Sequence, residues 1–200
     1  MVVFMKGPLC SVLLSFLCIS SIHAESIDNS KLVNQSKENI ELNYSTGAYA
    51  SIEIKRPVAE VFKILTDVSS WPEINKGVTQ KITPAVVNVS KNSKFKETIS
   101  SPIPGIKDWT NEWTIEEFIP NRKFVISGLE TFASVPIYSR ITYEFKGTKK
   151  NETTFKRTIE VTLDKSFIEG TQKQEVEALY RFLGSQWEMA NHLRNYVESK

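Results

Sequence analysis

Hydrophobic and polar residues alternate along most of the chain, which is the pattern of half-buried β-strands. The first such strand is predicted from Ala48, where apolar residues take every second position: Ala48, Ala50, Ile52 and Ile54. Further alternating stretches follow, and Gly and Pro residues separate them from one another. These stretches predict six more strands, at residues 78–89 (broken near Pro84), 94–100, 109–118, 123–127, 137–146 and 152–163.

Helical periodicity appears after the first strand and again at the end of the chain. Pro57 opens a short helix, and Ser69 to Pro72 starts a second short helix or turn. Residues 172–199 predict one long helix with a wide apolar stripe: Val176, Leu179, Tyr180, Leu183, Trp187, Ala190 and Val197. Only the sheet offers a surface large enough for this stripe. We therefore expect an α+β fold, a curved antiparallel sheet of about seven strands wrapped on the C-terminal helix.

Three stretches resemble the polyketide cyclase/dehydrase and lipid transport family of the START-like (SRPBCC, helix-grip) superfamily. They are ASIEIKRPVAEVFKILTDVSSWPEINKGVTQ, WTNEWTIEEFIPNRKFVISG and ITYEFKGTKKNETTFKRTIEV. The resemblance covers roughly residues 48–198. It implies a helix-grip domain with a cavity between sheet and helix, and in this superfamily such a cavity binds apolar ligands such as lipids, sterols or polyketides.

The first 24 residues are predicted to be a secretory signal peptide. Lys6 supplies a positive charge, the apolar run from Pro8 to Ile19 is too short to span a bilayer, and Ala24 is a small residue suited to cleavage. An uncleaved membrane anchor is the alternative. Residues 25–46 are polar and predict a flexible lead before the domain at 47–200. We therefore expect a secreted or periplasmic protein that is cleaved near Ala24.

The chain that follows the predicted signal has few residues suited to catalysis or metal binding, and its net charge is small. Cys10 and Cys18 lie in the predicted signal, and His192 is the one histidine that follows it. His192 is predicted to face away from the cavity, so the residues for a hydrolytic triad or a zinc site are lacking. The net charge is +2 with both signs interspersed, which argues against a nucleic-acid partner. We expect neither a metal nor a cofactor.

Polar residues on the apolar face of three strands are the candidate site. Glu97, Asn111 and Arg157 each alternate in phase with large apolar neighbours, so they are predicted to point inward. A buried ion needs a partner, and we expect Arg157 to meet Glu97 or the acidic head of a ligand. A β-bulge that shifts the register and exposes one of them is the alternative. The remaining cavity wall is predicted from Phe95, Trp109, Trp113, Phe124, Phe155, Tyr180, Leu183 and Trp187.

We favour the interpretation that the protein carries a hydrophobic small molecule and catalyses no reaction. The expected ligand is a lipid, a sterol or a polyketide-like compound. Two alternatives stay open. In a cyclase or dehydratase, Glu97 would have a raised pKa and act as the base. In an interaction module, aromatic side chains would fill the cavity, and the four Trp, six Tyr and nine Phe that follow residue 24 make this feasible. Loops 101–108 and 128–136 are the expected gates, and a transient membrane contact is compatible with a carrier.

Overall fold

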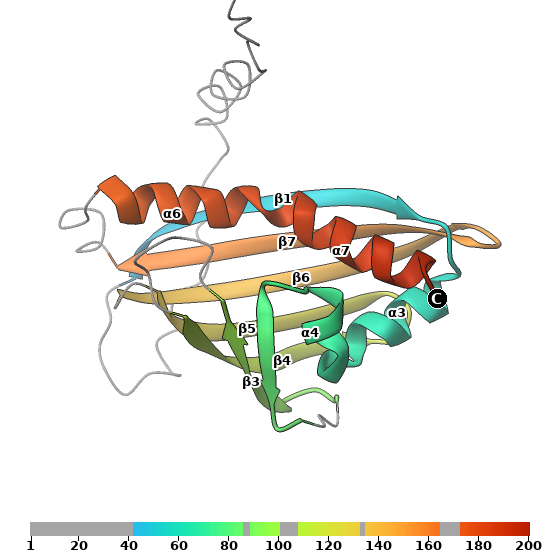
Figure 1. The fold of residues 1–200 in the computed structure, drawn as a ribbon, viewed down its shortest axis with the longest axis horizontal. Coiled ribbons are helices and arrows are strands. Elements are labelled where there is room, and N and C mark those ends of the chain that lie inside the picture. Colours follow the sequence, from blue (N-terminus) through green and yellow to red (C-terminus); the bar gives the residue numbers. More distant parts are fainter. Residues whose placement is uncertain (1–41, 86–88, 101–107, 133–134, 165–172) are drawn as a thin grey trace, which may run out of the picture. The chain divides into compact units, whose positions relative to one another are not determined.

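Seven strands form one antiparallel sheet in the order β1-β7-β6-β5-β4-β3-β2 (Figure 1). The computed structural model describes residues 42–85, 89–100, 108–132, 135–164 and 173–200. The strands are β1 Leu42–Ile54, β2 Thr79–Thr83, β3 Lys94–Ile99, β4 Trp109–Ile119, β5 Lys123–Phe132, β6 Val135–Lys149 and β7 Glu152–Asp164. The helices are α3 Val58–Thr66, the 3-10 helix η1 Val68–Ser70, α4 Trp71–Ile74, α6 Lys173–Gly184 and α7 Gln186–Glu198. The predicted α+β fold, with a C-terminal helical segment packed on the sheet, is confirmed.

β1, β5 and β6 are longer than their sequence patterns predict. β1 begins at Leu42 and not at Ala48, because its first residues already pair with the end of β7, although they lack the alternating pattern that begins at Ala48. The expected gate at residues 128–136 is mostly strand, since β5 runs to Phe132 and pairs with β6 as far as Val135. Gly128 and Pro136 suggested a loop, and backbone pairing overrides that signal.

Several expectations concern residues outside the described part of the chain. These include the signal peptide at 1–24, residues 25–41 of the lead, and residues 101–107 of the first predicted gate, all of which stay predictions. Among the helices of the described residues, none is long and apolar enough to cross a membrane.

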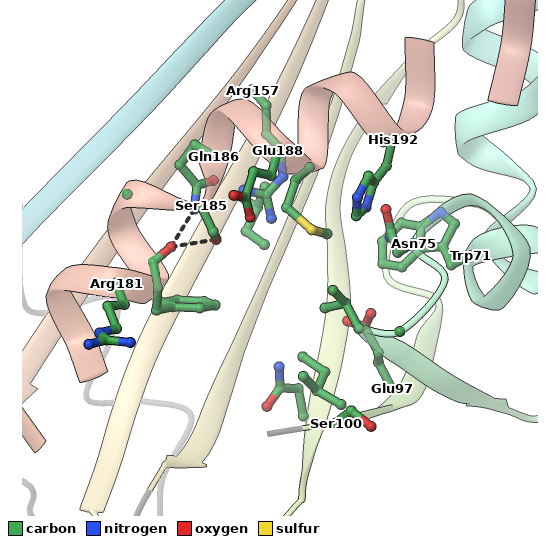
Figure 2. Close-up of a pocket in the computed structure, with 18 of the residues that line it drawn as sticks. Trp71, Asn75, Glu97, Ser100, Arg157, Arg181, Ser185, Gln186, Glu188 and His192 are labelled. Atoms are coloured by element: carbon green, nitrogen blue, oxygen red, sulfur yellow. Dashed lines mark hydrogen bonds between the residues drawn. The ribbon is translucent and has the colours of Figure 1, made fainter. Parts of the chain in front are cut away.

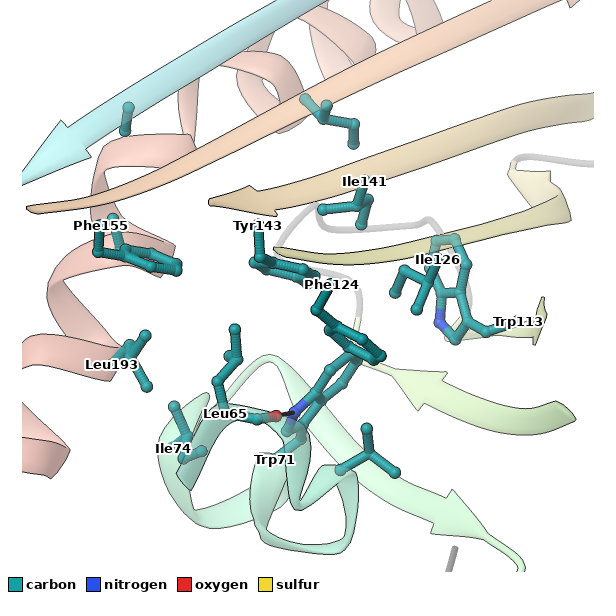
Figure 3. Close-up of a cluster of buried hydrophobic side chains, with 14 of the residues drawn as sticks. Leu65, Trp71, Ile74, Trp113, Phe124, Ile126, Ile141, Tyr143, Phe155 and Leu193 are labelled. Atoms are coloured by element: carbon teal, nitrogen blue, oxygen red, sulfur yellow. Dashed lines mark hydrogen bonds between the residues drawn. The ribbon is translucent and has the colours of Figure 1, made fainter. Parts of the chain in front are cut away.

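The hydrophobic core lies between one face of the sheet and the helices (Figure 3). Aromatic rings form a row across three neighbouring strands: the rings of Phe124 and Tyr143 stack with centroids 5.7 Å apart, and those of Tyr143 and Phe155 with centroids 6.2 Å apart. From the helical side, Trp71 packs its ring edge-on against Phe95. The Trp71 indole N–H donates a 2.8 Å hydrogen bond to the carbonyl oxygen of Leu65, which ties α4 to α3.

The C-terminal helical segment is divided at Ser185 into α6 and α7. Three groups donate to the carbonyl oxygen of Phe182: the Ser185 amide at 3.2 Å, the Ser185 hydroxyl at 2.7 Å and the Gln186 side-chain amide at 3.1 Å. Gly184 and Ser185 together are a frequent cause of helix kinks, because Gly is flexible and the Ser hydroxyl bonds back to the preceding turn. The predicted single helix is therefore two helices that share one direction along the sheet (Figure 1).

Candidate functional site

A cavity of about 420 Å³ lies between the sheet, α4 with the turn that follows it, and the C-terminal helical segment. Its apolar wall is mainly aromatic and comes from Trp71, Trp109, Trp113, Tyr143 and Phe182. Its polar lining includes Glu97, Asn111, Arg157, Gln186 and His192. In Figure 2, Glu97 on β3, Arg157 on β7 and His192 on α7 approach this space from three sides. The interior is thus hollow, and the alternative that aromatic side chains fill it is wrong for this structure.

The inward orientation predicted for the three strand polar residues is confirmed. Glu97, Asn111 and Arg157 are only 5%, 1% and 6% exposed, and all three line the cavity. Trp109 and Trp113 line it as well. The register explains part of this arrangement, because Glu97 and Asn111 stand directly opposite each other on β3 and β4. Their role in binding a ligand stays a prediction.

Four predicted wall residues are buried one layer below the cavity. Phe95, Phe124, Phe155 and Leu183 belong to the hydrophobic core, and none of them is in the lining. Trp71 covers Phe95, with ring centroids 5.5 Å apart, and Tyr143 stacks on both Phe124 and Phe155. The covering rings of Trp71 and Tyr143 therefore form the surface that a ligand would meet.

Tyr180 and Trp187 do not belong to the cavity wall, contrary to expectation. They are 66% and 55% exposed and are absent from the lining. The helix positions that are buried follow a narrow seam with spacings of four and three residues: Leu179, Leu183, Gln186, Ala190, Leu193 and Val197. Tyr180 and Trp187 each come one residue after a seam position, which places them about 100° around the helix from it. They lie on the flank opposite to the cavity.

His192 lines the cavity, so the prediction that it faces away is wrong. The cavity lies beside the helix, along the flank whose residues come one position before the seam. Four residues that line the cavity each come one position before a seam residue: Phe182, Ser185, Met189 and His192. The helical wheel could not show which flank faces the cavity, because this depends on how the helix docks on β1 and β7.

The lining also contains residues of α4 and the turn after it, which sequence reasoning missed. Trp71, Asn75, Gly77 and Val78 form this part of the wall. In the sequence, the Trp71-Pro72 pair indicates only the start of a helix, and a short polar turn carries no signal of its own for a cavity.

Glu97 is a buried carboxyl group held by two hydrogen-bond donors. The Thr79 hydroxyl donates to its Oε1 at 2.6 Å, and the Trp113 indole N–H donates to its Oε2 at 2.8 Å. Burial raises the pKa of Glu97, because a charged carboxylate loses its hydration in this environment. The hydrogen bonds from Thr79 and Trp113 and the positive charge of Arg157 act in the opposite direction and only reduce the shift.

Arg157 does not form the expected ion pair with Glu97. Among the described residues, its guanidinium makes no salt bridge, and its Nη1 has no hydrogen-bond partner. It lies over the ring of Tyr143, its neighbour on β6, with 5.7 Å between the guanidinium carbon and the ring centroid. Burial raises the pKa of the Tyr143 hydroxyl, so this neighbour stays neutral and supplies no counter-charge.

Several polar atoms of the lining lack a partner within the described part of the chain. They are both side-chain polar atoms of Asn111, Nη1 of Arg157, Oε1 of Gln186 and Nδ1 of His192. Buried polar atoms are paired in the great majority of cases, so such a group around one cavity indicates a surface prepared for polar contacts. Among the described residues, no group of three or more His, Cys, Asp or Glu side chains could hold a metal ion.

Comparison with known sequences gives no assignment, since neither a protein-family model nor a curated protein matches the chain. Solved structures do match. The Zhui aromatase/cyclase from Streptomyces sp. R1128 aligns over 78% of this chain and 94% of its own, with a TM-score of 0.62 and 15% identity. A conserved protein from Geobacillus kaustophilus aligns over 77% of this chain and 96% of its own, with a TM-score of 0.57 and 13% identity.

A plant enzyme shares the same architecture. Norcoclaurine synthase from Thalictrum flavum, in complex with dopamine and hydroxybenzaldehyde, aligns over 78% of this chain and 88% of its own. Its TM-score is 0.53 and its identity is 11%. These identities are low, and the likeness concerns the arrangement of sheet and helices. The chain therefore has the helix-grip fold that these solved structures share.

Proposed function

We propose that the protein binds a small aromatic molecule in the cavity between the sheet and the C-terminal helices. The observation that carries this proposal is an open cavity of about 420 Å³ whose apolar wall consists mainly of aromatic rings. This volume falls in the range of about 300–1,000 Å³ that is typical of small-molecule sites. Norcoclaurine synthase, which shares the fold, has been solved with two aromatic compounds bound, and this supports the same class of ligand here.

The polar lining favours a ligand with polar substituents over a plain hydrocarbon chain. An alkyl chain against Asn111 and Arg157 would leave their polar atoms without water and without a partner. Each such atom costs about 1–3 kcal/mol. A ligand that offers oxygen atoms at these positions removes the cost. Within the classes expected from the sequence, this favours a polyketide-like aromatic compound over a fatty acyl chain or a sterol.

The first prediction concerns tryptophan fluorescence. Trp71, Trp109 and Trp113 line the cavity, whereas Trp187 lies on the exposed flank. Titration with 2-naphthol should therefore change the tryptophan emission in a saturable way, and Trp187→Phe should keep the full change. Organic extraction of the purified protein, followed by mass spectrometry, should recover an aromatic compound. If no small molecule is recovered, and 2-naphthol, oleate and cholesterol all leave the emission unchanged, the binding proposal fails.

The second candidate function is acid–base catalysis on the bound molecule, and the raised pKa of Glu97 favours it. A carboxyl group whose pKa lies above its ordinary range can donate and accept a proton at a higher pH than an exposed glutamate. An aromatase/cyclase among the matching structures is consistent with this chemistry. It requires Glu97 to titrate above the ordinary range of a glutamate.

The second prediction tests that titration. Since the folded state holds the Glu97 proton more tightly than the unfolded state, this group lowers stability as the pH rises from the ordinary glutamate pKa of 4.5 through the folded pKa. Glu97→Gln removes the effect, and its amide can still pair with Thr79 and Trp113. Urea unfolding from pH 4 to pH 8 should therefore show the variant gaining stability relative to the parent as the pH rises. Two parallel stability curves would contradict the raised pKa, and with it the catalytic candidate.

We also propose that the domain is exported after cleavage near Ala24. The charged start, the short apolar run and the small residue at position 24 support this. N-terminal sequencing of the protein from fractionated cells should place the mature start at Glu25 in the exported fraction. An intact start in the membrane fraction would favour the anchor instead.

A further inference from the structure

The strongest unexplained feature of the cavity is a buried cation without a counter-ion among the described residues. Arg157 is 6% exposed and faces the cavity from the middle of β7. An isolated ion in a protein interior costs several kcal/mol unless a partner of opposite charge is present. A hydrophobic residue at this position would complete the wall at no such cost, so the arginine calls for a reason beyond packing.

The neighbours of Arg157 in the described part of the chain do not supply the missing negative charge. Its partners in the sheet are Ala50 on β1 and Tyr143 on β6, and neither carries a negative charge. The carboxyl groups in the described lining are those of Glu97 and Glu188. Glu97 is engaged by Thr79 and Trp113, and Glu188 is exposed; neither forms an ion pair with Arg157.

We propose that Arg157 is an anion-binding subsite, and that the molecule in the cavity is an aromatic acid whose carboxylate pairs with this guanidinium. The inference rests on the proposed binding function and specifies its ligand. A guanidinium suits this task, because it stays charged and can donate two parallel hydrogen bonds to one carboxylate. The aromatic body of the acid would lie against the rings of Trp71, Trp109 and Trp113.

Asn111 indicates a second polar group on the ligand, in addition to the carboxylate. It projects into the same cavity from β4, it is 1% exposed, and both polar atoms of its side chain lack a described partner. A side-chain amide both donates and accepts hydrogen bonds, so a hydroxyl group satisfies it better than a second carboxylate. The best-fitting class is therefore a hydroxylated aromatic acid.

Two probes of nearly the same shape test the charge requirement. Isothermal titration calorimetry at pH 7.5 compares 2-naphthoate with the neutral 2-naphthamide. The parent protein should bind 2-naphthoate about tenfold to a hundredfold more tightly, since a hydrogen bond to a charged group is worth more than a neutral one. Arg157→Met should abolish this preference and leave the affinity for 2-naphthamide nearly unchanged, whereas Arg157→Lys should keep part of it. Arg122→Met, which removes an exposed arginine outside the lining, is the matched control and should keep all of it.

The outcomes separate this inference from the binding function on which it rests. If the parent binds the two probes equally, or if the preference survives in Arg157→Met, the anion subsite is refuted while the binding function stands. If neither probe binds, the aromatic acid is refuted as the ligand, and the binding function fails with it only if 2-naphthol, oleate and cholesterol also leave the tryptophan emission unchanged and extraction recovers no small molecule. Decanoate carries the same carboxylate on an alkyl chain, so binding as tight as that of 2-naphthoate would refute the aromatic part of the inference. If Arg157→Met does not fold, two other measurements decide whether the anion subsite exists. They are the relative affinity of the parent protein for 2-naphthoate and 2-naphthamide, and the part of this preference that Arg157→Lys keeps.

Discussion

Alanine at position 128 should destabilise the protein by about 3 kcal/mol. Gly128 stands opposite Trp113 in the pairing of β5 with β4. A Cβ atom there would overlap the backbone oxygen of Glu112 and would lie 3.1 Å from Cε3 of Trp113. The obstacle is backbone and cannot turn aside as a flexible side chain would, so the two strands must separate locally. Urea unfolding of Gly128→Ala measures the effect.

Gly147→Ala is the matched control for this substitution. Gly147 also lies inside a strand, but the nearest atom to an added Cβ is Cγ1 of Val58 at 3.8 Å, an ordinary contact. The added methyl group should leave stability unchanged or raise it by up to about 1 kcal/mol, because Gly loses more backbone freedom on folding than Ala. Equal losses in the two variants would contradict the close approach at Gly128.

The strand residues of the site could be predicted from the sequence, because strand alternation is a local property. In a strand, successive side chains point to opposite faces, so Glu97 shares the face of Phe95, and Arg157 shares that of Phe155. The same argument could not separate the cavity wall from the layer beneath it. Tyr143 covers Phe124 and Phe155 only because β5, β6 and β7 are neighbours in the sheet.

The helical wall could not be predicted in the same way. The apolar stripe of a helix fixes which side is buried, but the cavity lies beside the buried seam, and its side depends on docking against β1 and β7. The predictions for Trp187 and His192 are therefore both wrong: Trp187 is exposed, and His192 lines the cavity. The Gly184-Ser185 pair was the one local signal of the break between α6 and α7.

Removal of the Trp113 side chain should have an even larger effect than alanine at position 128. Trp113 is 2% exposed, packs against Gly128 and donates the hydrogen bond that holds Oε2 of Glu97. Trp113→Ala should cost about 3–5 kcal/mol, because it removes a large buried side chain and leaves a void that joins the cavity. Urea unfolding at pH 7 measures this loss, and a loss below about 1 kcal/mol would show that the indole is not part of the packed interior.

Trp113→Phe separates the packing of the indole from its hydrogen bond. The phenyl ring keeps much of the buried apolar surface but has no N–H group, so Oε2 of Glu97 loses its donor. The hydrogen bond from Trp113 lowers the pKa of Glu97, so its loss should raise that pKa further. The variant should therefore lose stability with rising pH over a wider range than the parent, whereas in Trp113→Phe combined with Glu97→Gln this pH dependence should vanish. If the double variant keeps it, Glu97 is not the group that titrates in the cavity.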